Sequence, residues 1–156
     1  MPFPPNAILG KFETSGPLAP PNLSAQIGAL VTEVGGVDPT TIIRVDQDWK
    51  IHVYWTVKGN LTEFVCGKWC VNAFLESMGP GPEINLHPAD LKIDLQPAPG
   101  ANDYYAMLLI QAGAVKADDC STPFKLVVTV TYMTPKGQPG PAAGFVEGPI
   151  LQFYHP

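Results

Sequence analysis

In much of the chain, hydrophobic residues occupy every second position and polar residues lie between them. In residues 49–58 (WKIHVYWTVK) the two kinds alternate strictly. Successive side chains of a strand point to opposite faces of a sheet, so this period predicts a strand with one buried face. The same period, or a short apolar run, predicts further strands. These are residues 27–34, 42–45, 69–76, 91–96, 104–111, 124–133 and 150–154.

Glycine and proline clusters separate these strands, at residues 35–36, 58–60, 79–82, 96–100 and 135–144. No window of 12 residues carries helical spacing free of these two residue types. Short strands between regular turns favour a single all-β domain, an antiparallel β-sandwich of about seven to eight strands. The segment at 135–144 is expected to be a loop.

The first part of the chain has a different character, because six prolines lie within residues 1–23. Proline fixes an extended or polyproline II backbone and does not support a helix. The sequence therefore predicts an extended arm over residues 1–23, followed by the sandwich domain over 24–156.

Three features of the sequence are similar to those of a known fold. They are the expected order of strands, Trp55 on an early central strand and the tyrosines of the late strands. In these features residues 25–154 resemble an immunoglobulin-like or fibronectin-type-III-like β-sandwich. The resemblance implies the fold and no particular activity.

Composition excludes several classes of protein. The net charge is −5 with a single arginine, whereas a nucleic-acid binder needs a cationic footprint. The apolar runs are too short for a membrane-spanning helix. The opening residues MPFPP lack the charged and apolar regions of a secretory signal. A cytoplasmic location is the default expectation, and assembly at a surface or outside the cell is the alternative.

The three cysteines, Cys66, Cys70 and Cys120, leave at least one without a partner in the chain. The spacing of Cys66 and Cys70 is not that of a zinc or redox motif. Small buried or half-buried thiols are the first interpretation, and a bridge from either residue to Cys120 is the second.

Catalytic chemistry finds little support, so the protein is expected not to be an enzyme. No nucleophile motif, nucleotide-binding loop or paired histidine spacing is present. No cofactor is expected, with calcium as the alternative because carboxylates in loops can supply its oxygen ligands. The calcium candidates are Asp46, Asp48, Asp118 and Asp119, whose other interpretation is ordinary turn chemistry.

Surface character is the better guide to function. The strand at 124–133 directs few charges outward, and residues 104–111 are apolar on both faces, although exposed sheet faces are usually polar. Aromatic residues on outer faces, such as Tyr54 and Tyr105, can be covered by the arm, contact a protein or stack on a sugar.

We therefore predict a structural or interaction protein that assembles with itself or docks to another protein, with carbohydrate or calcium-dependent adhesion as the alternative. The predicted contact residues are Phe3, Pro4 and Pro5 in the arm, and Val127, Thr129 and Met133 on the outer face.

Overall fold

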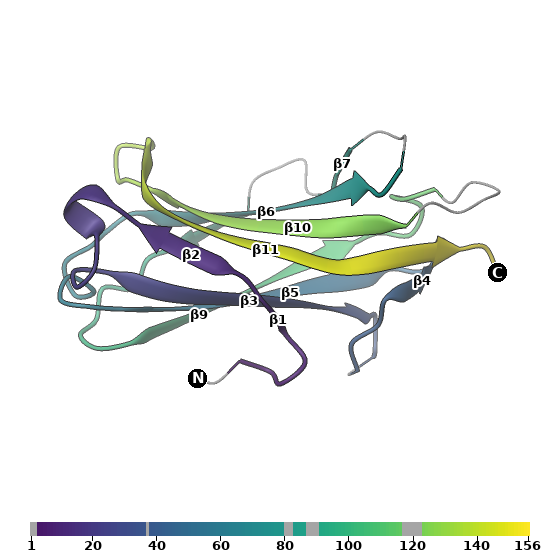
Figure 1. Ribbon diagram of the computed structural model, residues 1–156, viewed down its shortest axis with the longest axis horizontal. Helices are drawn as coiled ribbons and strands as arrows, with labels where there is room; N and C mark the ends of the chain where they lie inside the picture. The colour runs from purple at the N-terminus through teal and green to yellow at the C-terminus, as the bar shows by residue number, and fades with distance from the viewer. Residues whose placement is uncertain (1–2, 37, 80–82, 87–90, 117–122) are drawn as a thin grey trace.

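The computed structural model describes residues 3–36, 38–79, 83–86, 91–116 and 123–156, which form two β-sheets packed face to face (Figure 1). The predicted all-β sandwich is confirmed. In chain order its elements are β1 (Ile8–Leu9), β2 (Lys11–Thr14), a 3₁₀ turn η1 (Gly16–Leu18), β3 (Ser24–Glu33), β4 (Ile42–Arg44), β5 (Trp49–Lys58), β6 (Lys68–Ser77), β7 (Ile84–Asn85), β8 (Leu91–Asp94), β9 (Asn102–Ile110), β10 (Phe124–Met133) and β11 (Pro139–Tyr154). In this part of the chain, no helix is long and apolar enough to cross a membrane.

The two layers have different strand orders. Sheet A runs β1-β3-β5-β9, and sheet B runs β2-β11-β10-β6-β7, with β8 also beside β6 and β4 beside β11. All these pairs are antiparallel except β4 with β11. In Figure 1, the layer of β3, β5 and β9 lies below the layer of β6, β10 and β11.

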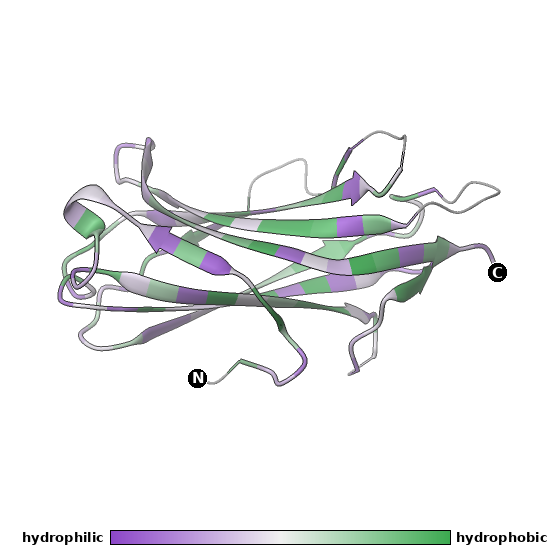
Figure 2. Ribbon diagram, in the orientation of Figure 1, coloured by the Kyte–Doolittle hydropathy of each residue, from purple (hydrophilic) through white to green (hydrophobic). Residues whose placement is uncertain are grey.

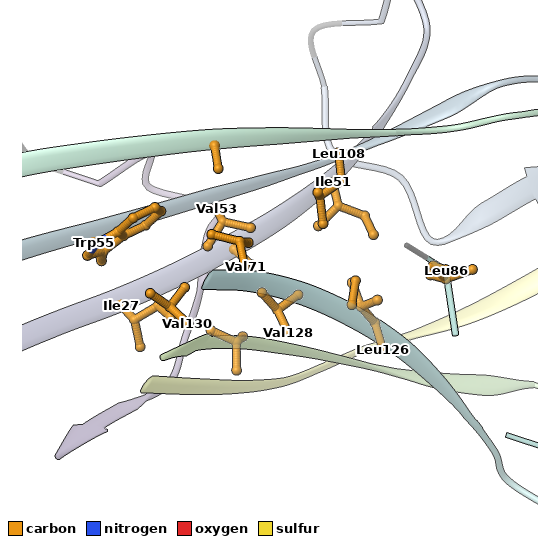
Figure 3. Close-up of a cluster of buried hydrophobic side chains, with 14 of the residues drawn as sticks. Ile27, Ile51, Val53, Trp55, Val71, Leu86, Leu108, Leu126, Val128 and Val130 are labelled. Atoms are coloured by element: carbon orange, nitrogen blue, oxygen red, sulfur yellow. The ribbon is translucent and has the colours of Figure 1, made fainter. Parts of the chain in front are cut away.

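The core fills the space between the layers with the apolar side chains of the alternating pattern (Figure 3). On β5, every second residue from Trp49 to Val57 is buried. The same alternation runs along β10, and Figure 2 shows it along β2 as hydrophilic and hydrophobic bands. Period two therefore predicts the inward face of β5, β9 and β10, whereas residues 27–32 of β3 are all buried.

Aromatic rings join the two sheets at one end of this core. Trp55 of β5 stacks on Tyr104 of β9, with ring centroids 5.4 Å apart and 11° between the planes. Trp69 of β6 meets both rings edge-on from the opposite sheet, at 6.3 and 5.9 Å. Both tryptophans are almost fully buried. Edge-to-face and offset-stacked pairs add stability beyond the apolar area that they bury.

The structure has more strands than the pattern predicts, and the loop predicted at 135–144 is wrong beyond Gln138. Only the turn around Gly137 is a loop, since β11 begins at Pro139. Gly140 lies directly against the ring of Tyr132, and Gly144 against the ring of Phe12. These glycines lack a side chain, so the aromatic rings can lie directly against the strand. In the sequence alone, glycines with this role cannot be told from glycines in a turn.

The predicted arm supplies a short strand to each sheet. Ile8 and Leu9 pair with β3, while residues 11–14 pair with β11. The chain crosses between the sheets at Gly10, where the backbone passes the carbonyl group of Phe145 so closely that a β-carbon would collide with it. This crossing closes one side of the sandwich.

Replacing Gly10 with alanine should therefore lower the free energy of unfolding by about 1–3 kcal/mol, because backbone rather than a flexible side chain must move. Denaturant unfolding measures the change. The control is Gly36→Ala in an exposed turn, where the nearest atom to the added carbon would be 3.3 Å away. Equal stability of the two variants would contradict this account of the crossing.

Candidate interaction surface

The six residues predicted to make contacts do not lie together. Phe3 lies against the outer face of sheet A, beside Tyr54 and Gly28. Val127, Thr129 and Met133 lie on β10 of sheet B, on the face opposite its buried residues. The sandwich therefore separates the two groups, and each outer face must be considered by itself.

The outer face of sheet A carries an apolar row along β9. Tyr105, Met107 and Leu109 are 45%, 40% and 48% exposed, and they alternate with buried residues that face the core. Across the strand pair they lie beside Tyr54, His52 and Lys50 of β5, respectively. We call Tyr54, Tyr105, Met107 and Leu109 the β9 surface.

A chain of hydrogen bonds orders the middle of this surface. His52 Nδ1 lies 2.6 Å from the hydroxyl of Tyr105, and His52 Nε2 lies 2.8 Å from Thr32 Oγ1. A neutral imidazole has one donor and one acceptor nitrogen, so both can be satisfied by hydroxyl groups. The rings of Tyr54 and Tyr105 also meet, with centroids 5.0 Å apart. These hydrogen bonds and the ring contact thus hold the Tyr105 side chain in one orientation.

Partial burial disfavours charge in this network. It lowers the pKa of His52 below 6.5, and the positive charge of Lys50 lowers it further. Desolvation also raises the pKa of Tyr54 and of Tyr105, with the neighbouring Tyr54 adding to the second shift. At neutral pH the network is therefore uncharged.

The arm borders the same face. The ring of Phe3 lies 6.5 Å from that of Tyr54, and a β-carbon on Gly28 would come within 3.3 Å of Phe3. Phe3, Pro4 and Pro5 also line a groove of about 440 Å³ beside β3. The arm thus packs on its own domain and covers part of Tyr54, while Tyr105 stays open.

The outer face of sheet B mixes apolar and charged side chains near its predicted contact residues, because Phe145 opposite Thr129 is 47% exposed and Ile150 opposite Lys125 is 51% exposed. Val127 lies between Phe74 and Glu147 on the neighbouring strands. Two residues earlier on the same face of β10, Lys125 Nζ lies 3.4 Å from carboxylate oxygens of both Glu76 and Glu147. Val127, Thr129 and Met133 are all half-buried. Their part in an interface stays a prediction.

The calcium candidates in the structure have local partners. Asp46 accepts two hydrogen bonds from Arg44, at 2.9 and 2.8 Å, and this interaction lowers the pKa of Asp46. Asp48 accepts one from the backbone amide of Ala112 at 2.7 Å. Asp118 and Asp119 lie outside the described residues. Across the described ranges, no group of three acidic, histidine or cysteine side chains could hold a metal ion.

The cysteines differ in exposure. Cys66 is exposed and not in a disulfide, whereas Cys70 is buried on β6. Cys120 lies outside the described residues. The interpretation of these cysteines as buried or half-buried thiols fits Cys70 but is wrong for Cys66, which is exposed.

Comparison with known proteins does not identify a family. No family model and no curated protein matches the chain. Among solved structures, it is similar to a Niemann-Pick type C2 protein from the Japanese carpenter ant. That match has 9% sequence identity and a TM-score of 0.36, and it covers 96% of each chain. A likeness this low carries no argument about function.

The sequence places Tyr105 among the outer-face aromatics that can contact a protein and shows residues 104–111 as apolar on both faces, but Met107 and Leu109 are not among the predicted contact residues. Their exposure follows from the position of β9 in its sheet. Strand order of this kind depends on pairing between distant segments, which a hydropathy pattern does not contain.

The lowered pKa of His52 predicts a dependence of stability on pH. Below about pH 6.5 the unfolded chain binds a proton at His52 more readily than the folded chain, so the free energy of unfolding should fall as the pH is lowered. His52→Gln should flatten this part of the curve while keeping hydrogen-bonding groups. Denaturant unfolding between pH 5 and 8 measures both curves, and parallel curves would contradict the assignment.

Proposed function

We infer that this protein is a non-enzymatic interaction protein that associates with further copies of itself through the β9 surface. The observation that supports the proposal is the row of Tyr105, Met107 and Leu109, which stays 40–48% exposed on the outer face of sheet A. Large apolar side chains in a contiguous row are costly to leave in water, and such rows are typical of contact sites.

The order of the surface favours the same function. The hydrogen bond between His52 and the Tyr105 hydroxyl fixes the Tyr105 ring, and the contact with Tyr54 supports it from β5. A side chain that is already held in place loses little conformational entropy on binding, so an ordered aromatic surface binds at lower cost. On sheet B the exposed Phe145 and Ile150 are separated by Glu147, which pairs with Lys125, whereas no charged residue interrupts the row on β9. We therefore favour sheet A for the contact.

Carbohydrate binding is a second candidate, favoured by the same rings. Tyr54 and Tyr105 form a paired aromatic platform on a sheet face, and sugars stack on platforms of this kind. A glycan array tests this candidate. Binding that Tyr105→Ala abolishes and Tyr105→Phe retains would support it, whereas an array without specific binding would reject it.

Self-association predicts that the average mass in sedimentation rises between about 5 µM and about 0.5 mM, the range expected for a modest interface. Leu109→Asp should weaken the association about tenfold, because a charge would be desolvated in the contact. Thr129→Asp, on the opposite outer face, is the matched control and should leave it unchanged.

A monomeric mass at every concentration would contradict the proposed function. If Thr129→Asp alone abolishes association, the contact lies on sheet B, at the surface predicted from sequence.

A further inference from the structure

We propose that β9 is the edge at which two copies of this chain pair antiparallel, so that their four-stranded sheets join into one continuous sheet. This inference rests on the proposed function and adds to it the strand, the direction and the register of the contact.

Strand length singles out β9 among the sheet edges. β9 has nine residues and pairs only with β5 within the described ranges. In the described part of the chain, every other strand at an edge of either sheet has two to four residues. Short edge strands are one way in which proteins prevent pairing with other chains, because an unpaired edge presents free N–H and C=O groups. β9 lacks this protection.

Charge does not protect β9 from pairing either. Residues 104–110 (YYAMLLI) contain no charged residue and no proline. The four-residue edge strands carry charges of both signs, with Lys11 and Glu13 on β2 and with Lys92 and Asp94 on β8. Charged residues, lysine above all, deter edge-to-edge pairing. The two-residue edges β1 and β7 are uncharged as well, so length and lack of central charge are combined in β9.

The sequence of β9 fits a second copy of itself. The uncharged residues 104–110 are centred on Met107, so a two-fold axis at that residue pairs all of them with one another. Tyr105 then faces Leu109 of the second copy, an aromatic–aliphatic pair of the kind that stabilises sheets. Asp103 faces Gln111, so no like charges meet.

Neighbouring registers fit less well. Directly opposite residues of an antiparallel pair point to the same face, so only registers that match outer with outer residues keep both cores on one side. Moving the axis to Ala106 meets this condition but places the carboxylate of Asp103 opposite Leu109. Moving it to Leu108 also meets the condition but places Tyr105 opposite Gln111, beyond the end of β9. The register centred on Met107 is therefore the one that the sequence favours.

Disulfide trapping tests the register directly. In a background with Cys66→Ser, Met107→Cys should form an intermolecular bridge on mild oxidation, since opposite residues of paired strands lie within disulfide range. Leu109→Cys alone should not, because the two thiols would be roughly 13 Å apart along the strands. Mixing Tyr105→Cys with Leu109→Cys should yield the mixed dimer, identified by mass spectrometry of the linked peptide.

A charge variant tests the edge without oxidation. Met107→Lys places two ammonium groups opposite each other at the axis and should weaken association by about tenfold or more. Leu9→Lys, on the short edge of the same sheet and 69% exposed, is the matched control and should associate like the parent protein. Thermal unfolding of both variants checks that the fold is kept.

The outcomes separate the two proposals. A parent protein that stays monomeric overturns the proposed function and this inference together. Association that survives Met107→Lys, with no preference for the bridge at Met107→Cys, overturns the β9 pairing and leaves self-association through another contact in place.

Discussion

The stack of Trp55 on Tyr104, met edge-on by Trp69, fixes which face of each central strand turns inward. Because these rings must lie between the sheets, every second residue of β5, β6 and β9 follows them into the core. The intervening residues then face outward whatever their character. On β5 these are mostly polar, but on β9 they are Tyr105, Met107 and Leu109, so packing of the core itself creates the apolar surface.

The edges of the sheets show how the rest of the fold avoids unwanted pairing. The crossing at Gly10 divides the N-terminal segment into two short strands, which occupy one edge of each sheet. On β11, residues 142–145 pair with β2 and residues 152–154 with β4. Among the residues that the structure describes, β9 is the long boundary strand without central charges, and our account assigns the contact between copies to this edge.

Much of the fold could be predicted from sequence, because alternation reports burial directly. The inward faces of residues 49–58 and 124–133 follow from period two alone. Gly140 and Gly144 misled the prediction, since glycine beneath an aromatic ring and glycine in a turn look alike without the ring's position. The site was predicted less well: Phe3 and Val127 were grouped by composition, whereas the sandwich places them on opposite faces. Exposure of Leu109 depends on strand order, which arises from pairing between distant segments.

Hydrogen–deuterium exchange of the backbone amides, compared between dilute and concentrated protein, tests the central claim most directly. Amides of a free edge exchange rapidly, and pairing with a second strand slows them. Our account predicts that the peptide covering β9 becomes protected as concentration rises, while peptides from β10 and β11 do not change. Protection confined to β10 and β11, or equal exchange of β9 at both concentrations, would contradict it.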